Sequence, residues 1–122
     1  PNILIHRALH LKIDIHFDQE DRLYLRGQKT RFRFHRISCP NPEVFGFSDV
    51  KNAAYVLETL SKANKACLEG QCQSLVTGPI HKASIIAGGF SFTGHTEFLA
   101  QQSKSQQVVM MLVAKKFRVA LA

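Results

Sequence analysis

The sequence predicts an α/β protein, and three patterns along its 122 residues support that class. The first third alternates apolar and polar residues, as half-buried strands do. Residues 48–69 then repeat apolar or small side chains at helical spacing. Between Ser74 and Ala100, a short apolar run and a Gly-Pro turn precede two short helical segments. This order gathers polar groups at turns, where open α/β folds bind their ligands.

Residues 1–46 are predicted to form a β-rich segment that ends in a connecting loop. Alternation is strict from Leu9 to Phe17, which predicts a strand. Further strands are predicted over Leu23–Leu25 and Arg31–Ile37, where apolar side chains again fall on one side. Pro40-Asn41-Pro42 then interrupts regular structure, because each proline disfavours helix at the preceding residue.

Residues 47–122 are predicted to form an α/β segment that opens with a long helix over Ser48–Glu69. Ser48 is the expected N-cap, and Gly70 ends the helix. Its apolar stripe is expected to be core and not a cofactor site. Gln106–Val113 predicts a buried strand, and Phe117–Ala122 predicts a strand that stops without a capping or turn residue. We therefore expect the natural chain to continue past Ala122.

The stretch from Ser74 to Ala100 is the part on which the functional prediction rests. Leu75 and Val76 are expected to end a buried strand before the turn at Thr77-Gly78-Pro79. Ile80–Ala87 predicts a short helix that Gly88-Gly89 stops. Phe90–Thr93 is expected to be extended and to lead into a second helix over Glu97–Ser103.

Gly94-His95-Thr96 carries the chemistry of this stretch. Gly94 permits close backbone approach, and His95 donates, accepts or changes charge near neutral pH. Thr96 offers a hydroxyl at a helix start, where unpaired N–H groups and the helix dipole favour an anion. These groups suit a small phosphorylated or hydroxylated acid. The alternative is that Thr96 only caps the helix and His95 is a satisfied loop histidine.

Two neighbouring side chains are weaker candidates for the same site. Lys82, near the start of the first short helix, is either an anion contact or a solvated charge. His81 precedes it and is the second candidate for a position near the substrate.

The net charge of +7 is concentrated in the first third of the chain. A run without acidic residues predicts either a nucleic-acid surface or, as we favour, a solvated strand face. Its cations are Arg22, Arg26, Lys29, Arg31, Arg33 and Arg36.

Other composition features restrict the class of protein. Cys39, Cys67 and Cys72 lack metal-site spacing and are expected to be reduced thiols. His6 and His10 would share one face of a helix, but two ligands do not make a metal site. No apolar run is long enough to span a bilayer and no signal-peptide pattern is present, so we expect a soluble cytoplasmic protein.

Three segments carry a resemblance to a known family: LVTGPIHK, FTGHTEFLA and VVMMLVAKKFRVALA. Together they resemble the 4-hydroxythreonine-4-phosphate dehydrogenases of pyridoxal 5'-phosphate biosynthesis, from about Phe47 to Ala122. The resemblance implies a fragment of a two-lobed α/β/α fold like that of isocitrate and isopropylmalate dehydrogenases, assembled as a homodimer. It also implies NAD-dependent oxidation of the 3-hydroxyl of 4-phosphooxy-L-threonine, followed by decarboxylation.

The resemblance assigns His95 and Thr96 to the substrate, since they match the family's Gly-His-Thr motif. It further implies a divalent metal (zinc, magnesium or cobalt) that polarises the substrate hydroxyl. The three histidine ligands of that metal are not matched here, and the first is expected in a Thr-Thr-His segment after Ala122. The NAD-binding loops are not matched either, so the 122-residue chain alone is predicted to be inactive.

Related four-carbon phosphorylated acids, such as the phosphates of threonate and erythronate, remain alternative substrates. A non-catalytic, basic nucleic-acid-binding module is the alternative from a different class of protein.

Overall fold

The computed structural model describes residues 2–20, 22–26 and 31–121. The chain divides into two compact units, Pro1–Phe47 and Ser48–Ala122. Among the described residues, each unit combines helical structure with a small antiparallel sheet, so the predicted mixed α/β class is confirmed.

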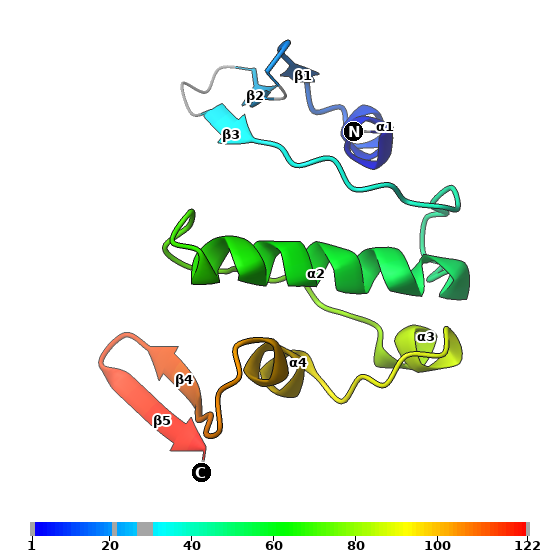
Figure 1. Cartoon of the computed structure of the whole chain (residues 1–122). Coiled ribbons are helices and arrows are strands. Elements are labelled where there is room, and N and C mark those ends of the chain that lie inside the picture. Colours follow the sequence, from blue (N-terminus) through cyan, green and yellow to red (C-terminus); the bar gives the residue numbers. More distant parts are fainter. Residues whose placement is uncertain (1, 21, 27–30, 122) are drawn as a thin grey trace. The chain divides into compact units, whose positions relative to one another are not determined.

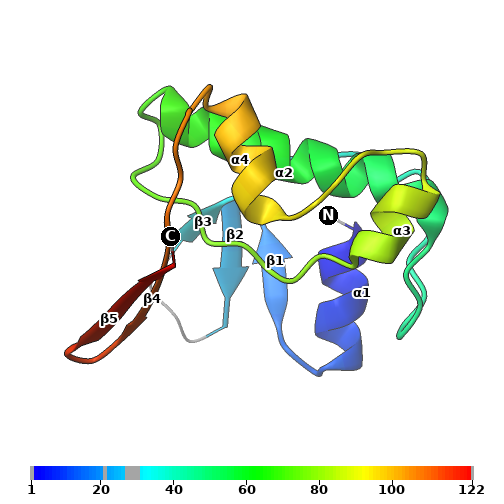
Figure 2. The same ribbon diagram turned by 90° about the horizontal axis from the view of Figure 1, so that it is seen from below.

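The first unit contains one helix and a three-stranded antiparallel sheet (Figure 2). The helix is α1 (Asn2–His10), and the strands are β1 (Ile15–Phe17), β2 (Arg22–Leu25) and β3 (Arg31–Arg33), in that order across the sheet. The predicted strand over Leu23–Leu25 is thereby confirmed. The strand predicted over Arg31–Ile37 pairs only in its first half.

The prediction of one strand from Leu9 to Phe17 is wrong in its first half. Helix α1 continues to His10, and sheet pairing begins only at Ile15. Leu9 also fits the helical spacing of the residues before it. It shares one face of α1 with Ile5 and Ala8, and Ala8 is buried. Lys12 ends the helix in a left-handed conformation, with φ of 55°.

The turn between β1 and β2 is organised by the Asp18 carboxylate. It accepts hydrogen bonds from the backbone N–H groups of Glu20 and Arg22, both at 2.9 Å. It also accepts from Arg22 Nε at 2.7 Å and from the Tyr24 hydroxyl at 2.8 Å. These hydrogen bonds, led by that from the Arg22 backbone, hold the pKa of Asp18 well below its ordinary range.

The second unit is built on the predicted long helix. A short 3-10 helix, η1 (Val50–Asn52), leads directly into α2 (Ala53–Leu68), and α3 (Lys82–Ala87) and α4 (His95–Gln102) follow. Figure 1 shows α3 and α4 along the same side of α2. Their core consists of Ala53, Leu60, Ile85 and Phe92, with Val56, Leu57, Leu75, Ile80, Phe98 and Leu99 packed against it.

Two helix starts differ from the prediction, and the glycine that follows α2 is confirmed. The first N-cap is Asp49 and not Ser48, because the Asp49 side chain accepts from the N–H of Lys51. Gly70 follows α2 with a φ of 73°, a conformation that favours glycine. Helix α3 begins at Lys82, two residues later than predicted, and ends at Gly88.

Gly88 is required by the packing of α3 against the start of α2. A Cβ atom on Gly88 would lie 2.5 Å from Ala53 Cβ and 3.1 Å from the Val50 carbonyl oxygen. Its φ of −76° is open to any residue, so the restriction is steric. The absence of a side chain therefore sets how closely α3 approaches α2.

The second unit ends in a hairpin of β4 (Met110–Ala114) and β5 (Phe117–Leu121). Both strands were predicted, but β4 is exposed along its whole length and so is not the buried strand expected over Gln106–Val113. The prediction that Leu75-Val76 ends a buried strand is also wrong, because neither residue is in a strand and Val76 is 91% exposed. A buried strand needs hydrogen-bonded neighbours and covered faces. Among the described residues, β4 and β5 pair only with each other.

Within the described residues, no disulfide joins Cys39, Cys67 or Cys72. None of the helices in the described ranges is both long and apolar enough to cross a membrane.

Candidate functional site

The N-terminal turn of α4 presents the Gly-His-Thr motif. The helix begins at His95, two residues earlier than predicted, so Gly94 is the N-cap and Thr96 lies inside the first turn. Gly94 is buried and extended, and His95 and Thr96 are half-buried. The N-terminal N–H groups of a helix have no partner within it, and the helix dipole adds positive potential there. Helix starts of this kind favour a bound anion.

A lysine from α3 reaches the same turn. Lys82 Nζ lies 3.7 Å from the position that a Cβ atom on Gly94 would occupy, and Lys82 Cε lies 3.9 Å from it. Lys82 is exposed, and it makes no ion pair within the described part of the chain. The fold thus brings an unpaired cation to the start of α4, from a residue twelve positions earlier in the sequence.

Glu97 is the acidic member of this group, and the sequence analysis did not single it out. Its Oε2 lies 3.0 Å from the Cβ position of Gly94 and accepts a 3.4 Å hydrogen bond from the Thr93 hydroxyl. A glutamate three residues after an N-cap often reaches back to the start of its helix. The spacing of three residues between Gly94 and Glu97 is therefore the sequence pattern that could have identified Glu97.

His95 is held against the core by one edge of its ring. It packs edge-on against Phe92, with ring centroids 6.1 Å apart. Its Nε2 atom is buried without a hydrogen-bond partner, which costs about 1–3 kcal/mol for a typical polar group. Nε2 is therefore closed to solvent in this conformation.

His81 has a structural role at the start of α3. Its Nδ1 accepts from the backbone N–H of Ser84 at 3.3 Å and lies 2.7 Å from the Ser84 hydroxyl oxygen. His81 is therefore the N-cap of α3. With Nδ1 occupied, the neutral ring carries its proton on Nε2. This cap fixes the beginning of the helix from which Lys82 extends.

The basic stretch of the first unit is partly neutralised by acidic neighbours. Arg22 contacts Asp18 at 2.7 Å and Glu20 at 3.0 Å, and Arg26 contacts Asp14 at 3.5 Å. Lys29 lies outside the described residues. These ion pairs fit the interpretation of a solvated strand face better than that of a nucleic-acid surface.

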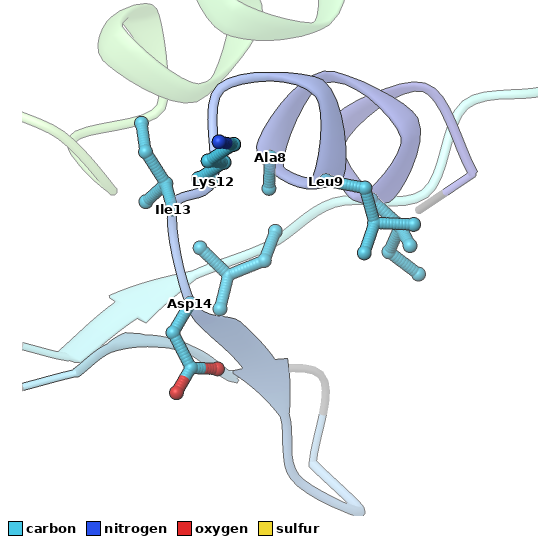
Figure 3. A pocket seen from close by; sticks show the side chains of 7 residues that line it. Ala8, Leu9, Lys12, Ile13 and Asp14 are labelled. Atoms are coloured by element: carbon cyan, nitrogen blue, oxygen red, sulfur yellow. The ribbon is translucent and has the colours of Figure 1, made fainter.

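The first unit also contains a pocket of about 290 Å³ between the end of α1 and the start of β1. Figure 3 shows Ala8, Leu9, Lys12, Ile13 and Asp14 around it. The pocket is lined by Ile5, Ala8, Leu9, Lys12, Ile13, Asp14 and Ile15, and so by none of the predicted site residues.

His6 and His10 both lie on α1, but they have separate partners. His6 Nδ1 is 3.1 Å from Glu43 Oε1, and the His10 ring lies 4.3 Å from the Phe45 ring. No group of three or more His, Cys, Asp or Glu residues within the described ranges is arranged to hold a metal ion.

The fold is that of a mixed α/β chain in which Lys82 of α3 reaches the start of α4, beside the Gly-His-Thr motif. Residues 2–122 match the family model of the pyridoxal phosphate biosynthetic protein PdxA, and the chain belongs to that family. The match includes the first third, so the prediction that the resemblance begins near Phe47 is wrong.

Relatives of known name agree with this assignment. The chain is 49% identical over 86 residues to the 4-hydroxythreonine-4-phosphate dehydrogenase of Sodalis glossinidius, an alignment covering 70% of this chain and 26% of that protein. It is 40% identical over 121 residues to the protein of the same name from Vibrio cholerae, covering 98% and 37% respectively. The chain thus spans between a quarter and two fifths of the length of these relatives.

Proposed function

We propose that this chain is the substrate-binding part of a longer NAD-dependent dehydrogenase. The reaction proposed for the longer protein is oxidation of 4-phosphooxy-L-threonine at its 3-hydroxyl, followed by decarboxylation, in pyridoxal 5'-phosphate biosynthesis. One observation of the structure carries this proposal: Lys82 of α3 ends beside the N-terminal turn of α4, which holds His95 and Thr96. A cation, a hydroxyl and unpaired backbone N–H groups together suit a phosphorylated acid.

Each side chain has a distinct part in the proposed binding. Lys82 and the first-turn N–H groups of α4 attract the phosphate or carboxylate of the substrate. Thr96 donates its hydroxyl hydrogen to an anionic oxygen or accepts from a substrate hydroxyl. His95 contacts the substrate through Nδ1, since its Nε2 is buried. His81 acts indirectly, because it caps the helix that carries Lys82.

The cofactors belong to the longer protein in this proposal. The described residues do not fit a divalent metal such as zinc, magnesium or cobalt, because no three potential ligands come together among them. We therefore derive no catalytic step through the metal or NAD, and we propose that the 122-residue chain alone is inactive. The resemblance to the family is the basis for three further proposals: a two-lobed isocitrate dehydrogenase-like fold, a homodimer and a cytoplasmic location. We also propose the division of this chain into segments 1–46 and 47–122.

Phosphorylated threonate and erythronate are the alternative substrates. They share the phosphate and carboxylate of 4-phosphooxy-L-threonine, so Lys82 and the start of α4 do not distinguish among these acids. They differ from it in carrying a hydroxyl in place of the amino group.

Calorimetric titration of the chain with 4-phosphooxy-L-threonine tests the binding proposal. We expect saturable binding that His95→Ala weakens and His35→Ala leaves unchanged, since His35 is an exposed histidine of the first unit. Equal weakening by both substitutions, or an affinity that neither changes, would refute the site. NADH formation by the chain with metal, NAD and substrate supplied would contradict its proposed inactivity.

A further inference from the structure

Glu97 places a negative charge beside the proposed anion site, near Lys82 but not in a direct ion pair with it. Its carboxylate and the Lys82 ammonium lie within 4 Å of the same point, the absent Cβ of Gly94. The Thr93 hydroxyl donates to Glu97, and no cation is paired with Glu97 among the described residues. A ligand at this turn therefore meets one positive and one negative side chain.

We infer that Glu97 is a specificity-determining residue that selects phosphorylated amino acids over the corresponding hydroxy acids. This inference rests on the proposed function. An amino acid presents an ammonium group, which a carboxylate binds with a charge-assisted hydrogen bond. A phosphorylated hydroxy acid presents only negative charges and hydroxyls, and like charges at short distance repel. The pair of Lys82 and Glu97 matches a substrate that carries both signs of charge.

Glu97 can also be explained as a structural residue that reaches back to the start of α4, as glutamates at this position do. That role is open to glutamine as well as glutamate. Glu97→Gln therefore keeps the structural role and removes only the charge. A purely structural role would change the affinities of amino and hydroxy acids by the same factor, whereas selection of the ammonium changes their ratio.

Two probes that differ in the amino group alone test the inference. O-phospho-L-homoserine and 4-phosphooxybutanoate are titrated into the 122-residue chain, and the dissociation constants are read from the amide NMR signals of α4. We expect the native chain to prefer O-phospho-L-homoserine by about two- to fivefold, the size expected of one solvent-exposed ion pair. Glu97→Gln should abolish the preference. Glu58→Gln, which changes an exposed glutamate on α2, should keep it.

The outcomes separate this inference from the proposed function. If both probes bind the native chain with equal affinity, or if the preference persists in Glu97→Gln, Glu97 does not select the amino group. Either result refutes this inference and leaves the proposed anion site unaffected. If neither probe moves the α4 signals, the proposed site is wrong and the inference fails with it.

Discussion

Substitution of Gly88 by alanine tests the contact that places α3, and with it Lys82, against α2. The new methyl group would lie 2.5 Å from Ala53 Cβ, well inside van der Waals contact. Overpacking of this kind costs about 1–3 kcal/mol. Alanine at a compatible φ recovers about 0.4–1 kcal/mol by restricting the unfolded chain. We therefore expect a net loss of about 0.5–2 kcal/mol in the free energy of unfolding.

Gly78→Ala is the matched control, because nothing lies within 4 Å of its Cβ position. Gly78 also lacks a positive φ, so this variant should be as stable as the native chain or slightly more stable. Urea unfolding followed by far-UV circular dichroism measures both changes. With a slope of about 1–3 kcal/mol per molar urea, Gly88→Ala should lower the midpoint by about 0.2–2 M.

The cause of the loss is tested in the background of Ala53→Gly, which removes the atom nearest to the new methyl group. The cost of Gly88→Ala should be smaller in that background. An unchanged cost there would show that the contact with Ala53 is not the cause. Equal stability of Gly88→Ala and Gly78→Ala would refute the close packing of α3 on α2 altogether.

Further predictions concern the core, the first unit and the anion site. Leu60→Ala should lower the free energy of unfolding by about 2–5 kcal/mol in the same urea assay, because Leu60 lies in the core and is only 5% exposed. Leu68→Ala, a change at an exposed leucine of the same helix, should lower it much less. The first unit should lose stability as pH falls below the unfolded-state pKa of aspartate, about 3.9, because the pKa of Asp18 is lowered by folding. NMR signals of β1 and β2 should report that loss. Asp18→Asn should reduce its pH dependence but not abolish it, because the pKa of Glu43 in the same unit is lowered as well. An unchanged pH profile in the variant would contradict this origin. Lys82→Ala should weaken binding of inorganic phosphate by a few-fold, and Lys51→Ala, a change at an exposed lysine of η1, should not.

Helix α2 was predictable from the sequence because sixteen residues carry one apolar stripe with a glycine beyond its end. Helix α1 was not predictable, because its few apolar residues fit the helical period as well as the two-residue period of a strand. They also continue directly into the alternating residues that lead into β1. The failure at Leu75-Val76 has another cause. A short apolar run does not show whether a pairing strand is present, and among the described residues none pairs with it.

The candidate site was predicted in its motif but not in its three-dimensional arrangement. Gly94-His95-Thr96 is contiguous in sequence, so local reasoning found it. The approach of Lys82 to Gly94 depends on the α3–α4 connection and on the packing at Gly88, which no local pattern records. The capping role of His81 was missed because serine, threonine, aspartate and asparagine are the usual N-caps.

The most direct test of the central claim is an NMR titration of the 122-residue chain with inorganic phosphate, with amide signals assigned. We predict saturable shifts centred on His95, Thr96 and Glu97, together with a response at Lys82 that Lys82→Ala diminishes. Shifts confined to the arginines of β2 and β3, with no saturable change at the start of α4, would contradict the claim that this turn binds the phosphorylated substrate.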